Sequence, residues 1–201
     1  MRKKIIHSAI AIMLLVANGV GAQDDFKRHE LEGGLGIWNT SQIVFTLSDA
    51  LSNSLGIGGM NVNNLSGSPA FHVGYKYWLT ERFGVGATLA MGSESGNVFN
   101  LEKQYQGQIQ RYYSNVAAEA AFNYINSEIF KVYALGGVGG LFLNQKYEPD
   151  GGSGTDKNDK GLFLDYQITP IGIKVGKNVG GFAEVGFGYK GIVNIGLFVR
   201  L

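Results

Sequence analysis

Residues 192–201, Ile-Val-Asn-Ile-Gly-Leu-Phe-Val-Arg-Leu, are the most informative part of the sequence about the fold. Apolar side chains occupy every second position from Val193 to Leu201, and the alternate positions form a mixed row that includes Asn194 and Arg200. A period of two is typical of a β-strand with one apolar face. A soluble protein rarely ends on such an exposed strand, whereas a closed membrane barrel needs a last strand that pairs with its first. The stretch therefore favours a transmembrane β-barrel.

The amino-terminal residues have the pattern of an export signal. Basic residues 2–4 precede an apolar run over 5–16, and Val-Gly-Ala at 20–22 supplies the small residues that a signal peptidase requires. We expect a signal peptide over 1–22 and one barrel domain over 23–201. The chain contains no cysteine, which excludes a lipid anchor on cysteine and a disulfide framework.

Composition excludes several other classes of protein. Hydrophobic residues make up 45% of the chain, but residues after the signal contain no apolar run of the roughly 18 residues that a transmembrane helix needs. Thirty-one glycines, three prolines and many aromatic residues favour strands with small inward and large outward side chains. Removing the signal leaves 14 of the 17 basic residues against 16 acidic ones, so nothing indicates a nucleic-acid partner.

Eight segments alternate in this way. They are His29–Trp38, Ala70–Leu79, Phe83–Gly92, Ile109–Ile125, Ile129–Tyr147, Gly161–Gly176, Gly180–Tyr189 and Ile192–Leu201. Short connections at 80–82, 126–128 and 177–178 alternate with long polar ones at 39–69, 93–108 and 148–160; only the last outer connection, at 190–191, is short. Outer-membrane barrels place short turns in the periplasm and long loops outside the cell. The predicted fold class is all-β: an eight-stranded antiparallel up-and-down transmembrane β-barrel with a cleavable N-terminal signal peptide.

Charge decides which face of each strand points outward, because a charged side chain on the lipid side is costly. The outward rows that follow are Phe71, Val73, Tyr75, Tyr77 and Leu79; Phe83, Val85, Ala87, Leu89 and Met91; and Ala183, Val185, Phe187 and Tyr189. Phe71, Tyr112 and Tyr189 are expected at the outer interface, with Tyr77 and Tyr124 at the inner one. The segment 131–147 is apolar on both faces, and Pro170 predicts a bulge. An outward Tyr75 beside an inward Lys76 would indicate a membrane barrel, and the reverse would indicate a soluble one.

Seven charged residues fall on inward positions. They are Glu30, Glu32, Lys76, Glu119, Asp165, Glu184 and Arg200. Eight strands leave an interior just wide enough for side chains, and buried charges must pair. We expect Arg200 to pair with Glu30 or Glu32, and Lys76 to pair with Glu119 or Glu184. The alternative is a solvated interior without specific pairs.

The first long connection predicts a helix. Ile43, Val44, Leu47, Leu51 and Leu55 recur at helical spacing between Ser41, a candidate N-cap, and Gly56, a candidate stop. A short amphipathic helix at the barrel mouth is the simplest interpretation. A strand extension, or a helix that meets a partner, is the alternative.

Three patterns resemble chemical sites, and each has a simpler explanation. Residues 186–191 match GxGxxG, but a strand follows where a dinucleotide site needs a helix. Residues 151–156 match the start of a calcium-binding nonapeptide, but only one copy is present. His72 beside Ser66 or Ser68 would be the start of a hydrolase site, although spacing indicates no acidic partner. We therefore predict no catalytic residue, no metal site and no cofactor.

Three motifs resemble the small outer-membrane β-barrel family of Gram-negative bacteria. They are His-Val-Gly-Tyr-Lys-Tyr at 72–77, Glu-Arg-Phe-Gly-Val-Gly at 81–86, and the closing stretch over 168–201. The resemblance implies an outer-membrane location and insertion by the barrel-assembly machinery, and it brings no shared catalytic residues. One departure is Leu201, because such barrels usually end on an aromatic residue. Recognition by the barrel-assembly machinery would then rest on Phe198 and the outward row.

The leading functional hypothesis is a non-enzymatic envelope protein that is structural or binds an extracellular ligand through 39–69, 93–108 and 148–160. Its other expected partner is outer-membrane lipid. A narrow pore and a barrel-wall hydrolase acting on lipid or peptide are the alternatives. A soluble ligand-binding barrel is disfavoured, since its apolar positions would face inward.

Overall fold

The computed structural model describes residues 27–55, 60–100, 102–150 and 157–201. The predicted signal peptide over 1–22, the helix stop at Gly56 and the pattern at 151–156 lie outside the described residues. Among those described, no helix combines the length and the apolar character needed to cross a bilayer. The elements are β1 (His29–Ile37), α2 (Thr40–Leu55), β2 (Met60–Gly67), β3 (Ala70–Trp78), β4 (Phe83–Asn100), β5 (Tyr105–Asn126), β6 (Phe130–Pro149), β7 (Lys157–Gly176), β8 (Val179–Gly188) and β9 (Val193–Arg200).

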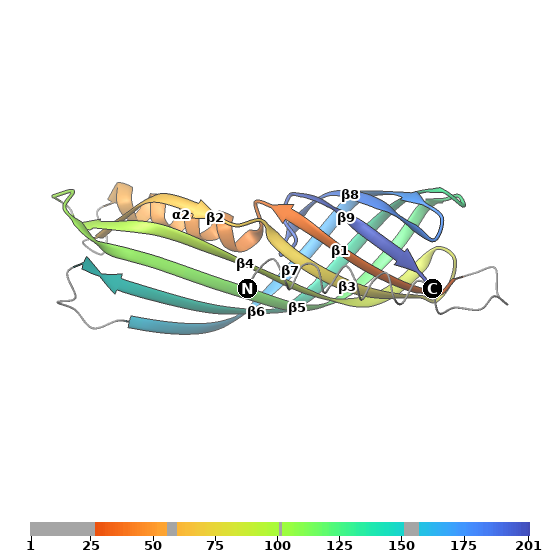
Figure 1. Cartoon of the computed structure of the whole chain (residues 1–201), viewed down its shortest axis with the longest axis horizontal. Coiled ribbons are helices and arrows are strands. Elements are labelled where there is room, and N and C mark those ends of the chain that lie inside the picture. The colour runs from red at the N-terminus through yellow and green to blue at the C-terminus, as the bar shows by residue number, and fades with distance from the viewer. Residues whose placement is uncertain (1–26, 56–59, 101, 151–156) are drawn as a thin grey trace.

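Eight of these strands close into an antiparallel ring (Figure 1). The order is β4-β3-β1-β9-β8-β7-β6-β5, and the pairing of β4 with β5 completes the circle. The first and last strands are neighbours, with Leu31 opposite Val199 and Glu30 opposite Arg200. The predicted eight-stranded barrel is therefore confirmed, and closure removes the strand edges that would otherwise be exposed.

The alternation of side chains follows the predicted inside and outside. Tyr75 is 41% exposed on the outer wall, whereas its neighbour Lys76 is 1% exposed in the interior. The bulge at Pro170 is confirmed, because the β7–β8 register shifts between Ile168 and Ile171. On β6, which the sequence left unassigned, Tyr133 and Leu135 are buried while Val138 and Phe142 are exposed. An apolar exterior around a polar interior excludes the soluble-barrel alternative.

Two predicted loops contain much strand. The segment 93–108 is largely taken up by β4 and β5, which pair as far as Phe99 with Tyr105. The described part of 148–160 belongs mostly to β6 and β7, which pair as far as Tyr147 with Lys157. Most of their outward positions are polar, as in the pair Ser95 and Gln110, so the apolar alternation that marks a strand is missing even though the backbones pair.

The segment 39–69 is also more ordered than a loop. It contains α2, as predicted, and β2, which was not predicted and pairs with the outer half of β4. Strands β2, β4, β5, β6 and β7 thus continue as an open sheet beyond the rim formed by β1, β3, β8 and β9 (Figure 1). We call this sheet the extension.

The helix begins one residue earlier than its predicted cap. Asn39, not Ser41, is the N-cap, because its Oδ1 accepts a hydrogen bond from the backbone N–H of Gln42 at 3.0 Å. Trp38 just before it has a φ of 57°, which turns the chain sharply out of β1. Ser41 lies in the first turn and is buried.

Candidate functional site in the barrel interior

Glu32 of β1 lies at the centre of the interior. Three lysines from three different places in the chain surround it: Lys76 of β3, Lys174 of β7, and Lys190 of the β8–β9 turn. The Nζ atoms of Lys174 and Lys190 lie 3.3 and 3.2 Å from its two carboxylate oxygens, and Lys76 is in direct contact. All four side chains are 2% exposed or less, so their charges are compensated by other buried charges and not by water.

Glu119 of β5 forms the second anionic centre, toward the extension. Its oxygens lie 2.9 Å from Lys190 Nζ and 3.6 Å from Lys76 Nζ. The Tyr189 hydroxyl donates a hydrogen bond to it at 2.8 Å. Glu119 and Glu32 thereby share two lysines, which ties β1, β3 and β5 together across the barrel.

Glu30 forms the third centre, near the end where the chain enters and leaves the barrel. Arg200 Nε donates to its Oε2 at 2.6 Å, and Lys174 pairs with its other oxygen. Aromatic rings surround these cations: Lys174 Nζ lies 4.9 Å from the Tyr133 ring centroid, and the Arg200 guanidinium lies 4.9 Å from that of Phe198. We call Glu30, Glu32, Lys76, Glu119, Lys174, Lys190 and Arg200 the interior charge cluster.

Two of the residues expected in this network lie outside the cluster. Glu184 accepts hydrogen bonds from the Tyr133 hydroxyl at 2.5 Å and from Asn194 Nδ2 at 2.7 Å, and Lys76 pairs with Glu32 and Glu119 instead. Asp165 accepts from Asn115 Nδ2 at 3.1 Å. Both carboxylates are therefore satisfied by neutral donors.

Sequence reasoning missed Lys174 and Lys190. Lys174 lies between the apolar residues Ile173 and Val175, which are both exposed on the outer wall, so its inward position was available from the alternation. Lys190 lies in a turn, where no alternation applies. Its neighbour Tyr189 was predicted on the outer interface, and that prediction is wrong, because Tyr189 is 3% exposed inside the barrel.

The inward path of this turn has a backbone cause. Gly188 and Gly191 have φ values of 146° and 113°, a region that side chains disfavour, and they bend the turn over the barrel mouth. Tyr189 then packs with Ala90 and Ala117 on the opposite wall. Residues 186–191, which match GxGxxG, thus form the end of β8 and a plug at the mouth, and β9 follows them.

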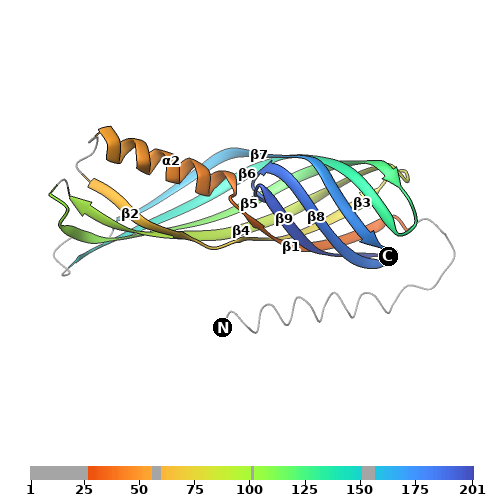
Figure 2. The same cartoon turned by 90° about the horizontal axis from the view of Figure 1, so that it is seen from above.

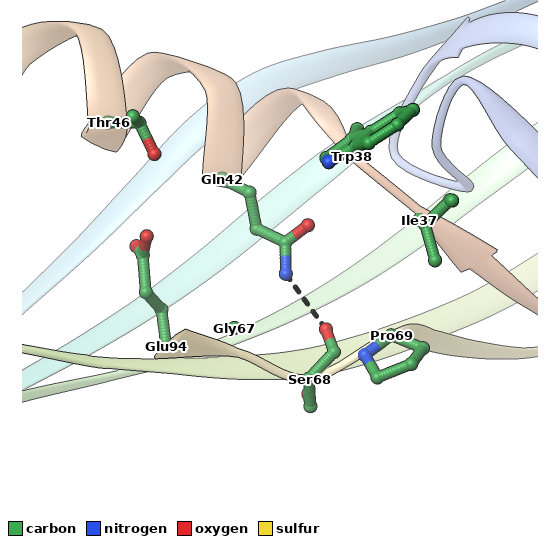
Figure 3. Close-up of a pocket in the computed structure, with 8 residues that line it drawn as sticks. All are labelled: Ile37, Trp38, Gln42, Thr46, Gly67, Ser68, Pro69 and Glu94. Atoms are coloured by element: carbon green, nitrogen blue, oxygen red, sulfur yellow. Dashed lines mark hydrogen bonds between the residues drawn. The ribbon is translucent and has the colours of Figure 1, made fainter. Parts of the chain in front are cut away.

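A small open pocket of about 230 Å³ lies beside the mouth, where α2 meets the start of the extension (Figure 3). Ile37, Trp38, Thr46, Pro69 and Glu94 line it together with Gln42, Gly67 and Ser68. Gln42 Nε2 donates to the Ser68 carbonyl at 2.8 Å and joins its two sides. The lining combines one carboxylate with neutral groups and offers no pair of a nucleophile and a base.

His72 does not assemble a hydrolase site within the described part of the chain. It is fully buried, and neither of its ring nitrogens has a hydrogen-bond partner there. The Ser68 hydroxyl is engaged with Ser93 instead. The described residues also contain no group of three or more side chains placed to hold a metal ion.

A closed ring of eight strands with an apolar wall and a paired ionic interior defines a barrel of the outer-membrane type. No protein-family model and no curated protein matches the chain. Among solved structures, it is similar to Ail, the attachment invasion locus protein of Yersinia pestis, in complex with the heparin analogue sucrose octasulfate (13% identity, 87% of this chain and 96% of that one, TM-score 0.47). It is also similar to the translocator domain of the autotransporter NalP from Neisseria meningitidis (9% identity, 100% and 98% covered, TM-score 0.38).

Proposed function

We propose that the protein is a non-enzymatic outer-membrane barrel whose closed interior anchors an extracellular binding surface, namely the extension. The observation that carries this proposal is the contrast between the barrel interior and the extension. The interior is filled by seven mutually paired charges and the Tyr189 plug, whereas the extension continues only one side of the wall as a sheet. A barrel whose function is conduction does not need such an asymmetric sheet.

The outer face of the extension is polar but carries little net charge. On β4 and β5 the cross-strand pairs are Ser93 with Tyr112, Ser95 with Gln110, and Asn97 with Gln108. The nearest charges on β6, Lys146 and Glu148, pair with each other at 2.7 Å. Hydroxyls, amides and exposed tyrosine rings suit a neutral ligand that is rich in hydrogen-bonding groups. A neutral glycan has this chemistry.

The double substitution Gln108→Ala with Tyr112→Ala tests the proposed surface. We expect it to weaken binding of the reconstituted protein to neutral glycans on an array at least tenfold, because exposed aromatic anchors carry much of the binding energy. Tyr124→Ala is the matched control: Tyr124 lies on the outward row of the same strand with 52% exposure, against 48% for Tyr112, but at the other end of the barrel. Equal loss in both variants, or no binding by the wild type, would contradict the proposal.

Conductance separates this proposal from the narrow-pore alternative. In planar bilayers we expect little steady current through the wild type, because paired side chains and the Tyr189 plug fill the interior. Tyr189→Ala should raise the current several-fold, since it removes the ring from the mouth and leaves every ion pair of the cluster in place. Tyr166→Ala, on the outer wall with 44% exposure, should behave as the wild type. A large steady wild-type current would instead favour the pore.

A further inference from the structure

The apolar outer wall is uneven in height. On β6 and β7 the outward apolar row reaches Phe142 and Leu162, which are 50% and 67% exposed and lie opposite each other. On β1 the row stops at Ile37, the last residue of the strand. With a rise of about 3.3 Å per residue and a tilt of about 40°, the wall is roughly 30 Å high from Phe130 to Phe142 but only roughly 20 Å high along β1.

Typical barrels of this type have an apolar band about 25 Å tall, so the β1 side falls short by itself. Helix α2 rises from this low side. It follows β1 after two residues and runs along the extension, close to the long axis of the molecule (Figure 2). At 1.5 Å per residue, the sixteen residues of α2 are about 24 Å long.

One face of α2 packs against the protein. The guanidinium of Arg111 lies 4.7 Å from the centroid of the Phe45 ring, Gln42 bonds Ser68, and Ser41 is buried. The opposite face carries Val44, Leu47 and Leu51, spaced at i, i+3 and i+7 and exposed by 53%, 58% and 54%. We call these three residues the α2 stripe.

The α2 stripe lacks the usual features of a surface in water. The helix contains a single charged residue, Asp49, in sixteen, whereas a water-facing helix surface is normally rich in charged side chains. The outward row of β1 that precedes the helix is apolar as well: Leu35, Ile37 and the adjoining Trp38 are 50%, 41% and 60% exposed. From Val44 to Leu51 the α2 stripe rises about 10 Å, which equals the difference in height between the wall on β6 and the wall on β1.

We propose that the α2 stripe lies against lipid acyl chains of the outer leaflet and completes the apolar band above β1, so that a helix replaces strand in part of the barrel wall. This inference rests on the membrane location of the proposed function. It deepens that proposal by assigning α2 to the membrane surface and not to the ligand-binding surface.

The absence of cysteine makes a direct test available. Single variants Leu47→Cys and Leu51→Cys are spin-labelled and the full mature chain is reconstituted in phosphatidylcholine vesicles. Collisions of the label with oxygen, which concentrates in lipid, are compared with collisions with a polar nickel complex. Val85→Cys, on the outward row of β4, reports lipid, and Gln108→Cys, on the extension, reports water.

Labels at 47 and 51 should match the label at 85, with nickel collisions several-fold fewer than at 108. Nickel access at 47 and 51 with protection at 85 would overturn the inference and leave the membrane location intact. Exclusion of both reagents at 47 would also overturn it, because a protein surface would then cover the stripe. Nickel access at 85 as well would overturn the proposed function itself.

Discussion

Glu32→Gln is expected to destabilise the barrel by about 3–5 kcal/mol, the usual cost of leaving buried charges unpaired. The reason is that Lys76, Lys174 and Lys190 all contact this one carboxylate, and none of the four side chains is more than 2% exposed. A neutral amide of the same shape leaves the four cations of the cluster with two remaining carboxylates, Glu30 and Glu119. Urea unfolding from lipid vesicles, followed by the shift in gel mobility between folded and unfolded barrel, measures the effect.

Glu148→Gln is the matched control for this substitution. Glu148 pairs with Lys146 at 2.7 Å, but both side chains are nearly half exposed, so water replaces the lost partner. We expect a loss below about 1 kcal/mol, as for other surface ion pairs. Similar losses in the two variants would mean that water solvates the interior and that its ion pairs contribute little.

Arg200→Glu is expected to be at least as damaging as Glu32→Gln, by about 4 kcal/mol or more, because it sets two carboxylates against each other in a buried site. Arg200 and Glu30 lie opposite each other where β9 meets β1, so the repulsion acts at the seam that closes the barrel. The substitution also removes the cation beside the Phe198 ring. Failure to refold into vesicles, seen as absence of the folded gel band, is the expected result.

Two further variants test whether the loss comes from the ion pair between Arg200 and Glu30. Leu201→Phe keeps the outward row and should fold as well as the wild type. Combining Arg200→Glu with Glu30→Arg should recover part of the loss, but not all of it, because Lys174 also contacts Glu30. A double-mutant cycle gives the coupling between the two sites. A better rescue by Glu32→Arg would contradict the observed pairing.

The architecture of the barrel followed from local patterns. Alternation within each strand depends only on neighbouring residues, so it revealed eight strands, the outward Tyr75 and the inward Lys76 without any knowledge of the fold. The helix over 40–55 and the bulge at Pro170 were local features of the same kind. Pairing of the first and last strands followed from closure, because a membrane barrel leaves no edge unpaired.

The partners of each charge, by contrast, were decided by the tertiary structure. Whether Arg200 meets Glu30 or Glu32 depends on the register of β1 against β9, which alternation alone leaves open. Lys190 reaches Glu32 only because two glycines bend its turn into the mouth, and the extension forms by backbone pairing between polar residues that carry no periodic signal. Spacing along one strand was enough to place most strand side chains inside or outside, although it failed at the β8–β9 turn, where Tyr189 and Lys190 point inward. Which inward side chains touch could be known only from the folded barrel, because contact across it depends on the stagger of all eight strands.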